Sequence, residues 1–238
     1  MYHSQTVAIL VNRQTKPFIR GVAPLAVAHV VFVLTIVFAL VALRSNGQAD
    51  EIFSNFGPND TFLPGGSLVW KNTTGGIIEM AGQFTVPAGA DPWTFNSLDV
   101  PFSSILNETN DVSMRLMTDN GGLPGTILEQ MPLGGITSTP TIFNVASSQN
   151  TSLVPGTSYW IAALPSTIST QGVIWHANPL GQFGRALHLA NANFGWQFQT
   201  EFLTPAMRIN GTREVPEPSA ALLAIMGLLG SLLTRRSR

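Results

Sequence analysis

Four carboxylates in the central part of the chain could form the acid pair of a glycoside hydrolase. They are Glu79, Asp99, Glu129 and Glu201. Glycoside hydrolysis needs two carboxyl groups about 5–10 Å apart across the scissile bond. Each of these acids is isolated in the sequence, and isolated carboxylates on a β domain are usually solvated surface groups. A glycoside hydrolase is therefore the third of our three hypotheses.

Nucleophilic hydrolysis has less support, because it needs a nucleophile, a base and an orienting group. Residues 50–214 hold two histidines, His176 and His188, and the chain contains neither a Gly-x-Ser-x-Gly nor a His-Glu-x-x-His motif. We interpret both histidines as ordinary residues of predicted strands. The chain has no cysteine, which excludes thiol catalysis and cysteine-based zinc sites.

Asp119 and Asn120 are the candidate calcium ligands, because they lie in a glycine-rich turn. Calcium takes six to eight oxygen atoms from carboxylates, carbonyls and waters. Asp and Asn in turns also bond their own backbone, and no EF-hand spacing is present. We therefore expect no cofactor, and keep these two residues as the alternative position for a metal ion.

Five tryptophans could form a surface on which sugars stack. They are Trp70, Trp93, Trp160, Trp175 and Trp196. Tryptophan usually fills the core of a β-sandwich because it buries a large area. Trp93, which follows a proline in a predicted loop, is the one that we expect to be exposed to a ligand. A carbohydrate-binding module with exposed aromatics, with or without calcium, is the second hypothesis.

The elements that must position these residues are β-strands. Short runs of β-branched and aromatic residues recur between clusters of Gly, Pro, Asn and Asp, and no long stretch has a helical period. We expect an all-β, antiparallel β-sandwich or jelly-roll-like domain over residues 50–210, with residues 211–214 as a linker. The predicted strands are 67–71, 76–86, 94–102, 111–118, 126–131, 141–145, 157–163, 173–177, 187–192, 195–201 and 206–210.

The first 49 residues have the organisation of a signal peptide. A charged n-region extends to residue 20, an apolar h-region covers residues 21–43, and Gly47 and Ala49 precede a cleavage position before Asp50. The expected partners are Sec-type export machinery and signal peptidase. Because the h-region is long enough to span a bilayer, an uncleaved signal anchor is the alternative. Both interpretations place residues 50–214 outside the cytoplasm.

Residues 215–238 combine a proline-rich segment, an apolar run and a basic end. The apolar run covers the 16 residues 219–234. As a helix it would be about 24 Å long against a hydrocarbon core of about 30 Å, which suits a transient membrane stop better than a permanent anchor. Arginines stay on the cytoplasmic side, and prolines keep their segment extended and open to a processing enzyme. The residues of the signal are Val215, Pro216, Glu217, Pro218, Arg235, Arg236 and Arg238.

This order of Pro-Glu-Pro, apolar helix and arginine cluster resembles the PEP-CTERM sorting signal. The resemblance implies a Gram-negative-type envelope and an exosortase, a membrane enzyme that recognises the Pro-Glu-Pro element and removes the tail. It also implies a link with exopolysaccharide and biofilm production. The resemblance covers only residues 215–238.

Two further motifs lie between the ends. Thr-Asp-Asn-Gly-Gly-Leu-Pro-Gly covers residues 118–125, and Leu-Val-Pro-Gly-Thr-Ser-Tyr-Trp covers residues 153–160. With Gln-Phe-Thr-Val-Pro at 83–87, this order resembles the choice-of-anchor R domain over most of residues 51–210. Met117 departs from the pattern, which more often has Tyr or Ser. The resemblance implies an extracellular β domain and supplies no catalytic residues.

The charge of the exported part limits its partners. Seven of the 12 basic residues and one of the 13 acidic residues lie outside residues 50–214, which leaves this part with a net charge of −7. Such a charge disfavours nucleic acid and anionic membrane surfaces. The first hypothesis is a non-enzymatic exported protein, because the signals at the two ends agree and the pattern between them is that of a β domain. It would be a membrane-anchored precursor in the cell envelope, cut at its tail, and then a component of the cell surface or extracellular matrix.

Overall fold

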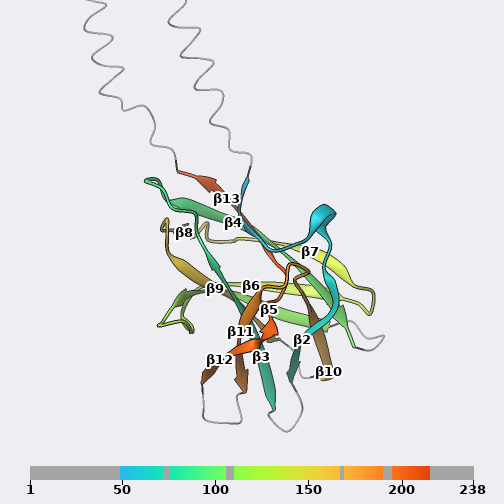
Figure 1. The fold of residues 1–238 in the computed structure, drawn as a ribbon. Helices are drawn as coiled ribbons and strands as arrows, with labels where there is room; N and C mark the ends of the chain where they lie inside the picture. The colour runs from blue at the N-terminus through green and yellow to red at the C-terminus, as the bar shows by residue number, and fades with distance from the viewer. Residues whose placement is uncertain (1–48, 72–75, 106–109, 167–168, 190–194, 215–238) are drawn as a thin grey trace, which may run out of the picture. The chain divides into compact units, whose positions relative to one another are not determined.

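The computed structural model describes residues 49–71, 76–105, 110–166, 169–189 and 195–214. These residues form one curled antiparallel sheet of 13 strands (Figure 1). The expected all-β class is confirmed: apart from a 3-10 turn over Pro58–Asp60, the described ranges contain no helix. None of their elements is thus a helix long and apolar enough to cross a membrane. The predicted signal helix and C-terminal membrane helix lie outside the described residues.

The strands follow the sequence pattern, and 11 of the 13 overlap a predicted one. The two that were not predicted are β1 and β8. In chain order the strands are β1 (Asp50–Ser54), β2 (Leu63–Lys71), β3 (Ile77–Thr85), β4 (Trp93–Ser104), β5 (Asn110–Asp119), β6 (Pro124–Ile136), β7 (Thr141–Ala146), β8 (Ser152–Leu153), β9 (Ser158–Pro165), β10 (Ser169–Ala177), β11 (Phe183–Leu189), β12 (Trp196–Leu203) and β13 (Arg208–Arg213).

The sheet curls because two strands change neighbours along one edge. Residues 93–99 of β4 pair with β13, and residues 102–104 pair with β10, while β7 and β8 cover the other edge. In β3 one edge pairs first with β2 and then with β9, and β11 covers the opposite edge. Strands that switch partners make the corners of layered β structures. The strands therefore form one continuous hydrogen-bonded sheet instead of two separate sheets. Its main path has the order β1-β13-β4-β10-β2-β3-β9-β5-β6.

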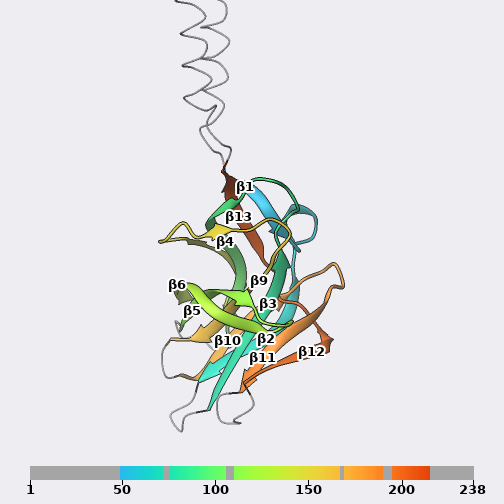
Figure 2. The same ribbon diagram turned by 90° about the vertical axis from the view of Figure 1, so that its left-hand side faces the viewer.

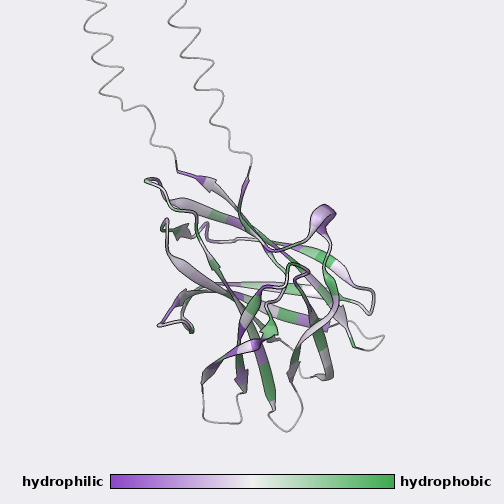
Figure 3. Ribbon diagram, viewed as in Figure 1, coloured by the Kyte–Doolittle hydropathy of each residue, from purple (hydrophilic) through white to green (hydrophobic). Residues whose placement is uncertain are grey.

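The curled sheet encloses a large apolar core. Trp175, Phe84, Phe95 and Phe102 are among the largest fully buried side chains, and burial of each contributes about 1.5–3 kcal/mol. Figure 3 shows hydrophobic and hydrophilic stretches on the strands. Buried and exposed residues alternate over much of β6, as expected when one face is buried, whereas β9 is buried along almost its whole length. A smaller apolar cluster around Trp160 forms beside β11.

The two ends of the described body are neighbours (Figures 1 and 2). β1 runs antiparallel to β13, which sets Asp50 opposite Gly211. Asn55, which is fully buried, fixes this arrangement. Its side chain accepts a hydrogen bond from Met207 N (2.6 Å) and donates one to Pro205 O (2.9 Å). The hydrogen bonds of Asn55 therefore hold the start of the domain against its end, although the residues involved are about 150 positions apart in the sequence.

Candidate functional site

A groove with a volume of about 360 Å³ lies between the start of β2 and the β11–β12 hairpin. Most of its lining is apolar, and two of its side chains are charged. Sites for small ligands usually combine an apolar lining with a few polar groups that fix orientation. The lining residues are Leu63, Pro64, Gly65, Gly66, Ala177, Phe183, Arg185, Glu201, Phe202 and Leu203.

Phenylalanines supply much of the exposed apolar surface around the groove. Phe183 is 63% exposed and Phe202 is 47% exposed, and both line the groove. Phe198 on the same hairpin is 49% exposed but lies edge-on to Trp160 and is not part of the lining. The register of β11 against β12 shifts between Phe183 and Arg185, and such bulges redirect side chains. A group of large exposed apolar side chains indicates an interaction site.

Arg185 is the buried cation of the groove, with only 9% of the residue exposed. Its Nε donates to Gln199 Oε1 (3.0 Å), and its Nη1 donates to Ser67 Oγ (2.6 Å). The guanidinium carbon lies 4.1 Å from the centre of the Phe202 ring, a cation–π contact. Burial lowers the pKa of Arg185, but a guanidinium stays protonated in proteins. The site therefore presents a fixed positive charge.

His176 supports the wall of the groove formed by the start of β2. This buried imidazole accepts a hydrogen bond from Gly65 N at Nδ1 (3.2 Å), and its Nε2 lies 3.0 Å from Ser103 Oγ. Because Nδ1 accepts, the proton is on Nε2, which donates to the serine. Burial lowers the pKa of His176, so the ring is neutral at pH 7. His176 therefore has a structural role in its strand.

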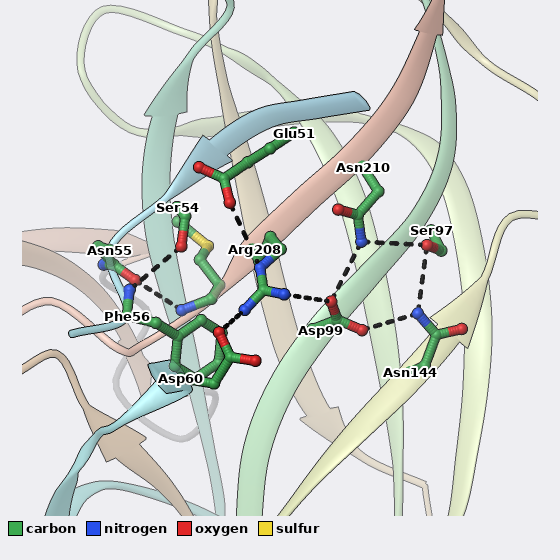
Figure 4. Close-up of polar contacts among 11 residues, drawn as sticks. Glu51, Ser54, Asn55, Phe56, Asp60, Ser97, Asp99, Asn144, Arg208 and Asn210 are labelled. Atoms are coloured by element: carbon green, nitrogen blue, oxygen red, sulfur yellow. Dashed lines mark hydrogen bonds and ion pairs between the residues drawn. The ribbon is translucent and has the colours of Figure 1, made fainter. Parts of the chain in front are cut away.

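A second polar cluster surrounds Arg208 beside the β1–β13 pair (Figure 4). The guanidinium forms an ion pair with Asp60, and it lies 3.5 Å from Glu51 and 3.8 Å from Asp99. Asp99 also accepts hydrogen bonds from Asn144 (2.7 Å) and from the Asn210 side chain. The cluster thus joins β1, β4, β7, β13 and the 3-10 turn, and it gives Asp99 a structural role.

Glu129 on β6 is the most buried of the four candidate acids, with 1% exposed. Its carboxylate accepts hydrogen bonds from Ser147, Ser148, Gln149 and Thr151, at distances from 2.6 to 3.2 Å. Burial acts to raise the pKa of Glu129, but these hydrogen bonds outweigh it, so the pKa is lowered. The residue stays ionised and holds the loop before β8.

The remaining two acids also lie on different strands. Glu79 on β3 faces His188 on β11, with Oε2 at 2.8 Å from Nδ1. Glu201 on β12 is exposed and lines the groove. Of the four acids proposed from the sequence, one therefore reaches the groove, and the other three are engaged in hydrogen bonds or ion pairs elsewhere.

Asp119 ends β5 and closes the glycine-rich turn. Oδ1 accepts hydrogen bonds from Trp160 Nε1 and Gln83 Nε2, both at 2.8 Å, and Oδ2 accepts one from Gly122 N (3.1 Å). The bond from Trp160 is the main cause of the lowered pKa of Asp119. Asn120 is exposed beside it. Within the described ranges, no group of three or more His, Asp or Glu residues is placed to hold a metal ion.

The expectation that Trp93 is an exposed loop residue is wrong. Trp93 is the first residue of β4 and is 6% exposed, because β8 and β13 pair with it on both edges. The core interpretation is confirmed for Trp160 and Trp175, which are fully buried. In the part of the chain that the structure describes, the large exposed aromatics are the phenylalanines Phe183, Phe198 and Phe202, which were not among the candidates from the sequence. The available signal was the alternation of Phe198 with Gln197 and Gln199 in the predicted strand 195–201, with Phe202 directly after that strand.

The two predicted processing sites flank the described body. Ala49 and Asp50 are exposed, and Asp50 begins β1. The residues of the predicted sorting signal (Val215, Pro216, Glu217, Pro218, Arg235, Arg236 and Arg238) lie outside the described residues. The described body ends at Glu214, whose N–H donates to Pro92 O (2.9 Å). Comparison of the chain with protein-family models gave no match, and comparison with curated proteins gave none either.

Proposed function

We propose that the chain is an exported, non-enzymatic protein with an extracytoplasmic β-sandwich-like domain, sorted through residues 215–238. An exosortase cuts this tail, and the domain then belongs to the cell surface or the extracellular matrix. The observation that carries the proposal is the pairing of β1 with β13, with Asp50 opposite Gly211. Because the predicted signal segment and tail attach at neighbouring strand ends, one membrane can hold both.

The environment of both predicted cleavage positions supports the proposal. Ala49 and Asp50 are exposed to signal peptidase. At the other end, Glu214 makes a backbone hydrogen bond, and Val-Pro-Glu-Pro follows directly in the sequence. Prolines favour an extended backbone, and an extended segment directly after a folded domain would be open to a membrane enzyme. The non-enzymatic assignment is supported by the structural roles of Glu79, Asp99 and Glu129.

The sorting proposal is tested in a bacterium that carries an exosortase. Three forms of the full chain are compared with the wild type by cell fractionation and by electrophoretic mobility: a deletion of residues 215–238, the double variant P216A/P218A, and the control P87A, which alters an exposed proline of the domain. We expect the deletion and the double variant to lose surface localisation and tail cleavage, and P87A to behave as the wild type. An unchanged localisation and mobility of the deletion would contradict the proposal.

Carbohydrate binding is the second candidate function, because the exposed Phe183 and Phe202 line a groove that also holds Arg185 and Glu201. It is compatible with sorting to an extracellular matrix that contains exopolysaccharide. A glycan array probed with the full chain, with and without calcium, tests it. If no glycan on the array binds, this second function is contradicted, and the sorting proposal is unaffected.

A further inference from the structure

We propose that the groove binds a sugar unit that carries a carboxylate, a uronic acid, with Arg185 holding the carboxylate and the phenylalanines packing against the ring. The inference rests on the second candidate function, carbohydrate binding, and names the class of glycan. It is independent of the sorting of the chain.

The first step of the argument is the missing counterion of Arg185. A buried charge is costly unless it is paired and hydrogen-bonded. The partners of this guanidinium, Ser67 and Gln199, are both neutral. No carboxylate in the described part of the chain forms an ion pair with it, and Nη2 has no hydrogen-bond partner there. An anion that enters the groove would supply the missing charge.

The second step is the orientation of the guanidinium. Hydrogen bonds to Ser67 and Gln199 fix two of its nitrogen atoms, and the Phe202 ring lies 4.1 Å from its carbon. A planar guanidinium matches the two oxygens of a carboxylate. Since the side chain is held before a ligand arrives, little conformational entropy is lost when the ligand binds.

The third step is the apolar surface beside the charge. Phe183 and Leu63 line the groove and are 63% and 41% exposed, which suits the apolar face of a ring. Glu201, also in the lining, can accept hydrogen bonds from sugar hydroxyls. The net charge of −7 on residues 50–214 opposes long, densely charged polyanions, so a short uronic acid oligomer is the suitable probe.

A peptide with a free C-terminal carboxylate fits less well. Such peptides are captured by backbone N–H groups that form a nest. The N–H of Gly65 at the groove is already donated to His176 (3.2 Å). The carboxylate would then depend on one arginine alone, without the backbone donors that recognise a chain end.

The experiment is isothermal titration calorimetry of the full chain in detergent micelles. The probes are tetraglucuronate, its methyl ester, neutral tetraglucose and the peptide acid acetyl-Leu-Phe. We expect tetraglucuronate to bind, and its methyl ester to bind about tenfold or more weakly, because it lacks the charged partner of the arginine. R185Q should cause a similar loss, and R185K should retain part of the affinity.

Two further variants keep the test independent of folding. R213Q neutralises an arginine that lies 5.1 Å from the Trp93 ring, outside the groove, and should bind as the wild type. Phe183 is mostly exposed, so F183A should fold normally and bind several-fold more weakly. Thermal unfolding of each variant shows whether R185Q is folded.

The outcomes distinguish carbohydrate binding in general from recognition of a uronic acid by Arg185. Equal binding of tetraglucuronate and tetraglucose, or a folded R185Q with wild-type affinity, would overturn the inference while carbohydrate binding stands. Binding of no glycan would overturn both. Tighter binding of acetyl-Leu-Phe than of tetraglucuronate would assign the groove to a peptide terminus instead.

Discussion

Six hydrogen-bond contacts end on the carboxylate of Glu129, and all of the donors lie within residues 147–151. We predict that E129Q lowers the free energy of unfolding at pH 7 by about 2–4 kcal/mol, because bonds to a buried charged acceptor are lost. Urea unfolding measures this. The control E201Q changes an exposed carboxylate and should lie within about 0.5 kcal/mol of the wild type.

The same residue predicts the pH dependence of stability. The folded-state pKa of Glu129 is lowered, so its stabilisation is present above the ordinary glutamate pKa of about 4.3 and is lost as the pH falls through the folded value. The difference between wild type and E129Q should therefore shrink in acid. A difference that stays constant between pH 7 and pH 3 would contradict this account.

Asp119 gives a second prediction at this scale. We expect D119A to lose about 1–3 kcal/mol of stability, because the indole N–H of the fully buried Trp160 loses its acceptor. The neighbouring variant N120A, at an exposed position, should stay within about 0.5 kcal/mol of the wild type. Calcium should leave the melting temperature unchanged, since the Asp119 oxygens already accept protein hydrogen bonds. A rise with calcium that D119A abolishes would restore the metal-site hypothesis.

The contacts and the exposure of single residues were harder to predict from the sequence than the strands. The types of Asp119, Glu129 and Trp93 were visible in the sequence, but most of their partners lie 18 to 120 positions away. A loop position for Trp93 followed from Pro92, and the pairing of β8 and β13 on both edges of β4 overrode it. Arg185 could not be selected, because its isolation from carboxylates exists only in the folded sheet.

Arg208 on β13 joins β1, β4 and the 3-10 turn through its ion pairs. Replacing it tests how much these ion pairs contribute to holding β1 and β13 in place. We predict that R208Q lowers stability by about 2 kcal/mol, because Glu51, Asp60 and Asp99 then face one another without a cation. High salt should reduce the loss by screening this repulsion. Thermal unfolding in low and in 1 M salt measures both effects.

Two variants show whether the charge is responsible. R208K keeps the positive charge and should lose less stability than R208Q. R213Q removes an exposed arginine of the same strand and should have little effect. If R208Q is as stable as the wild type at low salt, the cluster does not contribute to the β1–β13 closure.

Most strands could be predicted because alternation and turn residues are local signals. β1 was missed because two of its five residues, Asp50 and Glu51, are acidic, and β8 because it has only two residues. Both are strands by virtue of their neighbours, β13 and β4. The order of strands in the sheet was beyond prediction, since pairs such as β2–β10 and β1–β13 join distant parts of the sequence.

At the scale of the whole molecule, the main feature is that the first and last strands of the described body, β1 and β13, lie side by side. A chain whose described body begins at the β1–β13 pair and ends beside it can be held by both ends at one membrane, and under the proposal cleavage before Asp50 and in the tail would release the domain. The groove between β2 and the β11–β12 hairpin is lined by residues 63–66, 177, 183, 185 and 201–203, and the proposed cleavage in the tail would leave all of them in the released domain. The proposed binding and the proposed sorting can therefore be tested separately.

The central claim is processing at the tail, and mass spectrometry of the two ends of the mature protein tests it most directly. The chain is isolated from the surface fraction of a host that carries an exosortase. We predict a C-terminus near Pro216-Glu217-Pro218 and an N-terminus at Asp50. An N-terminus upstream of Asp50 would indicate the uncleaved signal anchor. A mature chain that still ends at Arg238 would contradict the account.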